Sequence, residues 1–294
     1  MPDANGHIVI TGMMTAQMYT LDPVTATFET TASPSFPGAR ALTIDRDGVW
    51  WVLLGTPQQI MRFDPTTQAS QTFDIGMYPH SIVQSDDGRV WFNGHFTKDP
   101  ELIGVLDPAT GEVETFEVPS PPTFDNGSTI PYGLRLGPDG MVWGTQLAGN
   151  RLVRFDPARE RFELYELPTE QSGPRRLDIA PDGTIWIPQY AASKLARFEP
   201  ATETFTEYDL PIRDALPYIA RVDPKTGVVW IATGAADAVL RFFPDEERFT
   251  VHPLPTRSAL IRHMGLDPDR EAAWVAYGNS PAVAPKIAHI EVVN

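Results

Sequence analysis

A tryptophan that returns at nearly even intervals constrains the fold of this chain more than any other feature of its sequence. Successive copies lie 41, 52, 43, 44 and 44 residues apart. Repeats of about 40–45 residues are typical of β-propellers, in which each repeat forms one four-stranded blade. The tryptophans that mark the copies are Trp50, Trp91, Trp143, Trp186, Trp230 and Trp274. We expect each of them to pack between neighbouring blades.

Turn signals divide each copy into four short segments rich in β-branched and aromatic residues. Asp-Gly pairs predict tight hairpins between an inner and a second strand, because glycine readily adopts positive φ. These pairs lie at 47–48, 87–88, 139–140 and 182–183. A second turn, between the third and outer strands, begins at Asp22, Asp64, Asp107, Asp156 and Glu199, each followed by proline. The pattern predicts an all-β fold of four-stranded antiparallel blades.

The number of strands decides the number of blades. Residues 37–255 supply five full copies, while 261–294 supplies an inner, a second and a third strand. The N-terminal stretch 6–30 supplies a second, a third and an outer strand, which brings the total to 26. We therefore predict one seven-bladed propeller over residues 1–294, lacking the first outer and inner strands, which would precede residue 6. A six-bladed propeller is the alternative, although it would discard one partial blade.

Composition excludes several classes of function. The chain has no cysteine, so disulfides, thiolate nucleophiles and cysteine-based zinc sites are ruled out. A formal net charge of −15 argues against a nucleic-acid partner. No apolar run is long enough to span a bilayer, and the first residues lack the basic end and apolar core of a signal peptide. We expect a monomer without nucleic-acid or membrane partners. Its compartment stays open: cytoplasmic, or periplasmic or secreted if a leader has been removed.

The repeat motifs resemble those of the streptogramin (virginiamycin B) lyases. In the copy that starts at Pro131 they are a Pro-Tyr-Gly-Leu start, a Pro-Asp-Gly turn, a Val-Trp strand, an Arg-Phe-Asp strand and a Tyr-Glu-Leu-Pro end. The similarity covers nearly the whole chain. It implies a propeller enzyme that opens a macrocyclic lactone by elimination, with Mg²⁺ near the central axis.

The resemblance also implies particular site residues. It places a catalytic histidine of the last blade at His263. At the three other family positions this chain has Tyr218 instead of a second histidine, and Ile261 and Gly278 instead of two glutamates. Because Mg²⁺ prefers carboxylate oxygens, the family's metal site has lost its carboxylate ligands here. We therefore expect no cofactor, with Mg²⁺ as the alternative that the resemblance leaves open.

One inner-strand residue from each blade is expected to face the central funnel, where propellers bind ligands. These residues are Arg40, His80, Tyr132, Arg175, Tyr218 and His263. The second strands are expected to add Asn93, His95, Gln146, Gln189, Tyr190, Thr233 and Tyr277. Such a set indicates an anionic organic substrate, since arginine holds a carboxylate through paired hydrogen bonds.

Roles follow from the chemistry of these side chains. We predict His263 as the general base, His80 or Tyr218 as the acid, and Arg40 and Arg175 as anion clamps. Tyr132, His95, Gln146, Gln189 and Tyr277 are predicted to contact the substrate. The tyrosines and arginines could instead fill the funnel and bond to neighbouring backbone. The remaining histidines, His7, His252 and His289, are predicted to be structural or to lie on the surface.

Three functions remain open on this reading. The first is a lyase-like enzyme that performs elimination, or lactone or ester opening, on an anionic small molecule. The second is a non-catalytic ligand- or protein-binding propeller from a larger protein. The third is a calcium-dependent lactonase, for which the required acidic and amide residues are absent from the predicted inner-strand positions.

Overall fold

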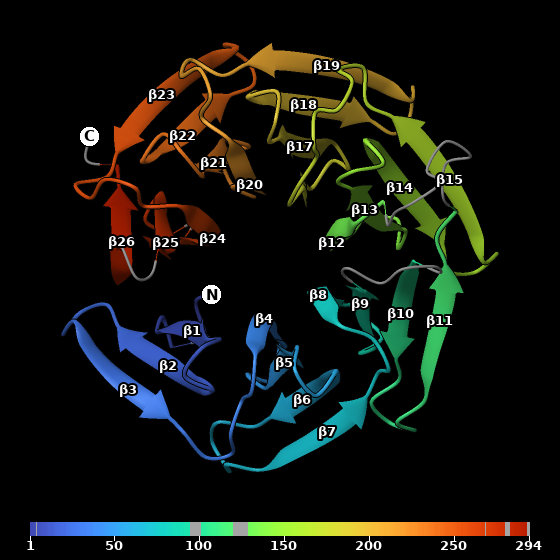
Figure 1. Ribbon diagram of the computed structural model, residues 1–294, viewed down its shortest axis with the longest axis vertical. Coiled ribbons are helices and arrows are strands. Elements are labelled where there is room, and N and C mark those ends of the chain that lie inside the picture. The colour runs from blue at the N-terminus through green and yellow to red at the C-terminus, as the bar shows by residue number, and fades with distance from the viewer. Residues whose placement is uncertain (4, 95–100, 120–128, 268, 280–282, 293–294) are drawn as a thin grey trace. The chain divides into compact units, whose positions relative to one another are not determined.

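The structure is a computed structural model that describes residues 1–294 except 4, 95–100, 120–128, 268, 280–282 and 293–294. The described residues form 26 β-strands and no α-helix, as predicted. In this described part the strands make seven antiparallel sheets, five of four strands and two of three (Figure 1). The sheets are the blades of a seven-bladed β-propeller, so the seven-bladed prediction is confirmed and the six-bladed alternative is wrong.

The chain divides into two compact units, Met1–Leu134 and Arg135–Asn294. In the first unit, the first blade contains β1 (Ile8–Gly12), β2 (Gln17–Asp22) and β3 (Thr27–Thr31). The second contains β4 (Ala39–Ile44), β5 (Trp50–Leu54), β6 (Gln59–Phe63) and β7 (Ser70–Asp74). The third contains β8 (Pro79–Gln84), β9 (Val90–Gly94), β10 (Leu102–Leu106) and β11 (Val113–Glu117). The division between the units falls within the next strand, β12 (Pro131–Leu136).

The second unit holds the rest of the fourth blade and the last three blades. The fourth blade continues with β13 (Val142–Gln146), β14 (Arg151–Asp156) and β15 (Arg161–Glu166). The fifth contains β16 (Asp178–Ile179), β17 (Ile185–Gln189), β18 (Lys194–Glu199) and β19 (Thr204–Asp209). The sixth contains β20 (Pro217–Val222), β21 (Val229–Thr233), β22 (Ala238–Phe243) and β23 (Arg248–Pro253). The seventh contains β24 (Ile261–Asp267), β25 (Ala272–Asn279) and β26 (Val283–Glu291).

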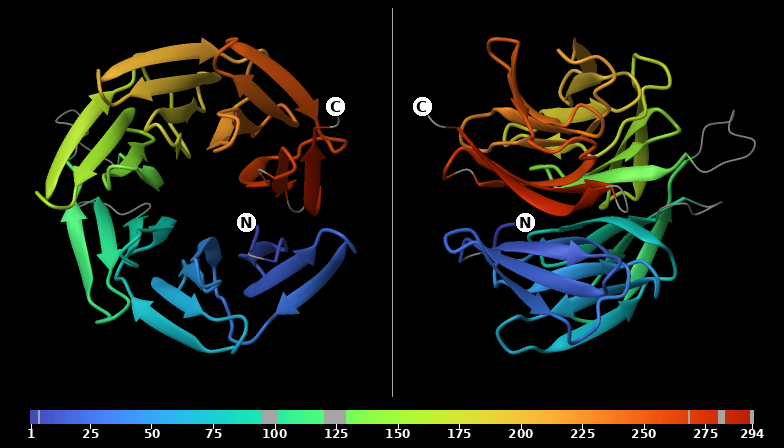
Figure 2. Two further views of the ribbon diagram at one scale, coloured as in Figure 1. Left: turned by 180° about the vertical axis from the view of Figure 1, so that it is seen from behind. Right: turned by 60° about the vertical axis from the view of Figure 1, so that its left-hand side comes forward.

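The two three-stranded blades stand at the ends of the chain, as predicted. Figure 2 shows the first of them, in blue, with β1, β2 and β3 side by side. The free edge of β1 is not bare, because Pro2 forms a bridge with Ile8 and the backbones of Met1 and Val9 exchange hydrogen bonds of 2.8 Å. Residues 1–3 therefore pair where the other blades carry an inner strand.

The predicted turns form as their chemistry requires. In the Asp-Gly turns, Gly48, Gly88, Gly140 and Gly183 have φ between +78° and +91°. In the Asp-Pro turns the aspartate side chain accepts backbone N–H groups two and three residues later, as Asp64 does from Thr66 at 2.8 Å and Thr67 at 3.2 Å. These hydrogen bonds satisfy the turn backbone locally.

Strand pairing corrects the predicted repeat by one residue in the second blade. Trp51 pairs with Thr43 of the inner strand, in the same way that Trp91 pairs with Val83. Trp50 instead pairs with Ile44, as Val90 pairs with Gln84. The repeating tryptophan of this blade is therefore Trp51, and the choice of Trp50 was wrong because two adjacent tryptophans fit the spacing equally well.

Trp143 and Trp186 pack both inside their own blade and against the next blade. Trp143 meets Phe198 of the next blade at 5.9 Å between ring centroids, and Trp186 meets Phe242 at 5.5 Å. Within its own blade each stacks on an outer-strand ring, Trp143 on Tyr165 at 6.1 Å. The predicted packing between blades is confirmed for Trp143 and Trp186.

His252 and His289 belong to this same aromatic packing. His252 stacks on Trp230 at 6.1 Å, in the outer-strand position that Tyr165 occupies beside Trp143, and His289 stacks on Trp274 at 4.2 Å. Burial, with help from the guanidinium of Arg241, lowers the pKa of His252, and burial also lowers the pKa of His289. Their structural assignment is consistent with these contacts, which favour the neutral imidazole.

We predict that the protein loses stability as the pH falls from about 7.5 to about 5.5. Because the folded pKa of His252 and His289 lies below the unfolded value, the unfolded chain binds more protons in this range, and acidification favours it. The midpoint of urea unfolding should therefore decrease. His252→Tyr, which installs the residue found at the matching position of the fourth blade, should reduce this pH dependence. An unchanged pH dependence in that variant would contradict the assignment.

Candidate functional site

The most organised polar cluster of the second unit surrounds Arg175. Its guanidinium carbon lies 3.6 Å from the ring centroid of Tyr190 and 4.3 Å from that of Tyr218. The two rings meet edge to face, with centroids 5.8 Å apart and planes at 89°. Arg175 is half-buried and Tyr218 is 9% exposed. Cation–π contacts of this kind are stronger in partly desolvated sites.

Three neighbouring segments of backbone build this cluster. The N–H of Arg175 donates to the carbonyl of Pro188 at 3.0 Å, which fastens its segment to β17. Tyr190 follows β17, and its N–H donates to Gly173 at 3.2 Å. Tyr218 lies on β20, the inner strand of the next blade. A Cβ at Gly234 would lie 3.4 Å from the Tyr190 ring, an ordinary van der Waals distance, so this ring lies directly beside the loop that follows β21.

Two aromatic rings restrict the Arg175 guanidinium. Their planes are at 89° to one another and their centroids lie 3.6 Å and 4.3 Å from its central carbon, which limits the orientations that the guanidinium can take. A planar fork presented in this way suits a carboxylate, which accepts two parallel N–H bonds. The contacts are therefore those of an arginine restrained by two rings, and its role as an anion clamp stays a prediction.

The next inner strand, β24, carries the predicted base, but the predicted register is wrong by one residue. In β20 the pairing shifts between Pro217 and Ile219, and in β24 it shifts between Ile261 and His263. The position of Tyr218 is therefore taken in β24 by Arg262, and His263 matches Ile219. Both Arg262 and His263 are exposed.

Four of the five predicted inner-strand residues that precede β24 share one position by strand pairing. Arg40 and His80 lie in the irregular steps of β4 and β8, as Tyr218 does in β20. Arg175 follows Pro174, which forms a bridge with Gln189 just as Pro217 pairs with Thr233.

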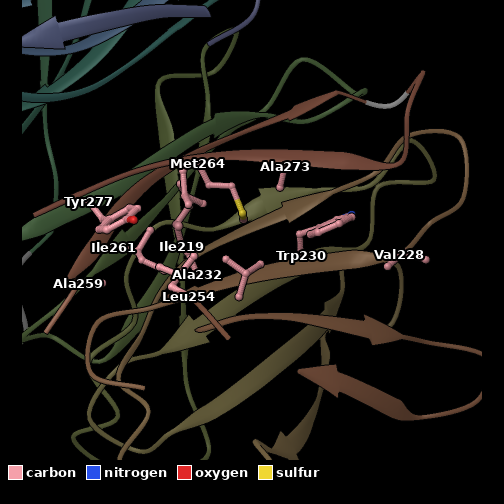
Figure 3. Close-up of a cluster of buried hydrophobic side chains, with 12 residues drawn as sticks. Ile219, Val228, Trp230, Ala232, Leu254, Ala259, Ile261, Met264, Ala273 and Tyr277 are labelled. Atoms are coloured by element: carbon pink, nitrogen blue, oxygen red, sulfur yellow. The ribbon is translucent and has the colours of Figure 1, made fainter. Parts of the chain in front are cut away.

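Positions that hold glutamates in the family motif cannot hold a metal here. Ile261 is fully buried in an apolar cluster with Met264, Trp230 and Tyr277 (Figure 3). A Cβ at Gly278 would lie only 2.9 Å from the Cα of Pro285. Among the described residues, no three His, Cys, Asp or Glu side chains gather as metal ligands do. These residues do not fit the Mg²⁺ that the resemblance implies.

Tyr277 and Gln189 are occupied by packing and by an internal network. Tyr277 is 7% exposed, and its hydroxyl lies 3.3 Å from the hydroxyl of Thr256. Gln189 is fully buried and donates to Glu207 at 2.5 Å. Glu207 also accepts from Thr169 at 2.6 Å and Lys194 at 3.3 Å. Burial would raise the pKa of Glu207, but the hydrogen bonds from Gln189, Thr169 and Lys194 outweigh it and lower that pKa.

Gln146 occupies the position in the fourth blade that Gln189 has in the fifth. It pairs with Arg151 as Gln189 pairs with Lys194, and it is 1% exposed. Both glutamines therefore lie at the end of a second strand inside the blade. Their predicted contact with a substrate stays a prediction.

In the first unit, His80 is held by backbone. Its Nδ1 lies 2.8 Å from the carbonyl oxygen of Tyr132, which can only accept, so this nitrogen carries a proton. Ser81 also donates to this carbonyl, at 2.7 Å, and its N–H donates to Asn93 at 2.9 Å. The ring of His80 packs on that of Tyr132 at 4.2 Å, and these two side chains are 1% and 5% exposed. They form a buried, ordered pair.

Arg40 makes a second arginine–tyrosine contact within the first unit. Its Nη1 donates to the hydroxyl of Tyr78, and its guanidinium carbon lies 4.9 Å from the centre of that ring. A Cβ at Gly55 would come within 2.8 Å of the Tyr78 ring, so glycine at this position permits the contact. The predicted residue His95 lies outside the described residues.

Sequence reasoning did not single out two members of these clusters. Tyr78 precedes Pro79 directly, and Arg262 precedes His263. The signal for Tyr78 was an aromatic residue just before an inner strand, in the blade that follows the one with Arg40. The signal for Arg262 was its place directly after Ile261, the residue with which β24 begins.

Comparison with known proteins gives information about the fold. No family model matches the sequence. No curated protein matches it either. Among solved structures, virginiamycin B lyase from Staphylococcus aureus superposes with a TM-score of 0.85 at 19% identity, over 100% of this chain and 94% of that one. The same values hold for its catalytically inactive histidine-to-alanine variant with quinupristin.

Two further structures extend this comparison. A streptogramin B lyase matches with a TM-score of 0.82 at 20% identity, over 99% of this chain and 95% of that one. The extracellular domain of a one-component system from B. thetaiotaomicron matches with a TM-score of 0.71 at 15% identity, over 94% of this chain and 38% of that one. The chain thus shares the seven-bladed propeller fold of the streptogramin lyases.

Proposed function

We propose that this protein is a lyase-like propeller enzyme that opens an ester or lactone of an anionic small molecule by elimination. The observation that supports it most is the orientation of Arg175 between Tyr190 and Tyr218, because a fixed guanidinium fork binds a carboxylate with defined geometry. His263 stands on β24, which packs beside β20, the strand that carries Tyr218. An anion clamp, a phenol and an imidazole are thus distributed over neighbouring strands of the second unit.

The proposed step uses these groups as follows. His263 takes a proton from the carbon next to the one that bears the ester oxygen. The electron pair of that C–H bond forms a C=C bond, and the C–O bond breaks with its electrons passing to the departing carboxylate. Arg175 holds the free carboxylate of the substrate in place, and Tyr218 donates a hydrogen bond to the leaving oxygen, where the charge develops. His263 then releases its proton to water.

No step of this scheme uses a metal ion. Ile261 and Gly278 provide no oxygen ligand, so the charge of the leaving oxygen is assigned to the Tyr218 hydroxyl. Arg175 is assigned to the free carboxylate of the substrate, since a guanidinium stays protonated at neutral pH.

The test is the identity of the product. The protein is incubated with quinupristin, which is bound by a structural neighbour, and with a panel of acylated β-hydroxy acids that carry a free carboxylate. Elimination in a lactone leaves the mass unchanged and creates a conjugated C=C bond, whereas hydrolysis adds one water. With a lactone we expect an unchanged mass, and with an acyclic ester two products whose masses sum to that of the substrate. In both cases we expect new ultraviolet absorbance and no inhibition by EDTA. Products that contain added water would contradict the proposal.

A matched pair of variants tests the role of Arg175. Arg175→Gln should raise KM, because it removes the clamp, while Arg257→Gln removes the same charge from an exposed position and should leave KM unchanged. Equal effects of the two substitutions would mean that only net charge matters and would overturn the assigned clamp.

The second candidate is a propeller that binds a ligand without converting it. The buried, apolar surroundings of Ile261 favour it, since a position that is acidic in the family motif has become part of the core. The extracellular domain noted above shows that this fold also occurs as one part of a longer chain. Calorimetric binding of a carboxylate compound that is never converted would favour this candidate.

A further inference from the structure

The segment that carries Arg175 has a short strand of its own. The inner strand of this blade, β16, contains only Asp178 and Ile179, whereas the inner strands β4, β8, β12 and β20 contain six residues each. Residues 167–177 lead from β15 to β16 and lie outside the named strands. Because so little of this segment belongs to a strand, hydrogen bonds from side chains of neighbouring elements contribute more to its position.

Two side chains fasten this segment just before Arg175. The Oδ1 of Asn150 accepts the N–H of Ser172 at 2.9 Å and its hydroxyl at 2.7 Å, and the Nδ2 donates to the carbonyl of Thr169 at 3.0 Å. Glu207, on the outer strand β19, accepts the N–H of Thr169 at 3.1 Å and its hydroxyl at 2.6 Å. The segment is thus held at Thr169 and again at Ser172.

The carboxylate of Glu207 also holds the strand on the other side of Arg175. It accepts a hydrogen bond from the Nε2 of Gln189 at 2.5 Å, and the amide nitrogen faces it because a carboxylate can only accept. The backbone of Gln189 forms a bridge with Pro174, and the carbonyl of Pro188 accepts the N–H of Arg175 at 3.0 Å. One carboxylate therefore joins the two backbone segments that meet at Arg175.

Comparison of the blades shows that an acidic residue is unusual at this position. Strand pairing matches Glu207 with Leu164 in the fourth blade and with Val251 in the sixth. The side chain of Glu207 is only 14% exposed, so its charge loses part of its hydration. The ammonium of Lys194, at 3.3 Å, and the hydrogen bonds described above offset this cost. An apolar side chain would fill the position without it but would connect nothing.

We propose that Glu207 is a positioning residue for Arg175. It acts from the outer strand, through its hydrogen bonds to Thr169 and Gln189, and keeps the guanidinium against the two tyrosine rings. A side chain that is already restrained loses less conformational entropy when it binds a ligand. This inference deepens the proposed function: its effect on KM rests on that function, whereas its effect on the position of Arg175 does not.

The experiment follows the Nε–H signal of Arg175 in proton–nitrogen correlation NMR spectra of the whole protein. Ring currents shift this signal, because the rings of Tyr190 and Tyr218 lie 3.6 Å and 4.3 Å from the guanidinium carbon. The signal is identified by its absence from the spectrum of Arg175→Gln. Glu207→Leu installs the residue of the fourth blade and should move the signal most of the way to that of an exposed arginine such as Arg257.

Matched variants separate this role from general packing. Glu207→Gln keeps an acceptor oxygen for Thr169 and Gln189 and should leave the Arg175 signal near its wild-type position. Glu163→Ala removes another outer-strand carboxylate, which pairs with an arginine at 2.8 Å in the fourth blade, and should not move the signal. Thr169→Val keeps the shape of the side chain without its hydroxyl, and it should move the signal in the same direction should Glu207→Leu fail to fold.

Kinetics give the second readout on an ester or lactone that the wild type converts. Glu207→Leu should raise KM by about tenfold, the effect of weakening one charge-assisted hydrogen bond, and should leave kcat near the wild-type value. Glu207→Gln should restore KM. A displaced Arg175 signal with an unchanged KM would overturn the link to substrate binding.

Three NMR results would overturn the positioning role itself. They are a wild-type signal at the position of an exposed arginine, an unmoved signal in Glu207→Leu and Thr169→Val, and an equal displacement in Glu163→Ala. Absence of any turnover by the wild type would contradict the proposed function alone, because the NMR signal reports the position of Arg175 without a substrate.

Discussion

Replacement of His263 by glutamine is expected to reduce kcat by about a hundredfold to ten-thousandfold, the range that a positioned general base contributes. Glutamine keeps a polar side chain of similar reach but cannot take a proton from carbon. Because Arg175 and Tyr218 remain in place, KM should change little. The measurement is steady-state kinetics on an ester or lactone that the wild-type protein converts, with kcat and KM determined separately.

Two controls sharpen this result. His7→Gln removes a histidine from the first unit that pairs with Asp3, and it should keep the wild-type kcat. Arg262→Gln removes the neighbouring side chain, which stands in the position of Tyr218, and should act on KM if it contacts the anionic substrate. A His263→Gln protein with full kcat would contradict the assignment of the base.

Replacement of Ile261 by glutamate is expected to lower the free energy of unfolding by about 3–5 kcal/mol, the cost of an unpaired buried charge. Ile261 is fully buried among Met264, Tyr277 and Ile219, and these neighbours provide no cation or hydrogen-bond donor for a carboxylate except the Tyr277 hydroxyl. Urea unfolding measured by tryptophan fluorescence gives the value. Ile261→Val is the matched control and should cost only about 0.5–1.5 kcal/mol.

The same variant tests the metal question. Added Mg²⁺ should not restore the stability of Ile261→Glu, because position 278 cannot supply a second carboxylate without a clash at Pro285. Recovery of the unfolding midpoint with Mg²⁺ would show that the family-type metal site survives in this fold and would contradict our reading of β24 and β25.

The periodic tryptophans and the Asp-Gly turns were enough to predict seven blades and 26 strands. Both signals are local, because each depends on a residue type that a tight turn or a half-buried strand needs. The errors were of one residue each. Trp50 was taken for Trp51, and His263 was aligned with Tyr218, although the bulge in β24 gives that place to Arg262.

A β-bulge adds one residue to one strand only, and no pattern of residue types in this sequence marks it. The contacts that build the candidate site could not be predicted from the sequence either, because they join residues of different blades. Arg175 reaches Tyr190 in its own blade and Tyr218 in the next. Gln189 was predicted to face a ligand, but Glu207 on the outer strand holds it through a hydrogen bond.

The most direct test of the central claim is a crystal structure of the His263→Gln protein with an unreacted anionic ester or lactone. We expect the carboxylate of the ligand to accept hydrogen bonds from Arg175, the ester oxygen to lie within hydrogen-bond distance of the Tyr218 hydroxyl, and the acidic C–H to face residue 263. A ligand bound elsewhere on the protein, with Arg175 and Tyr218 not contacting it, would contradict the account.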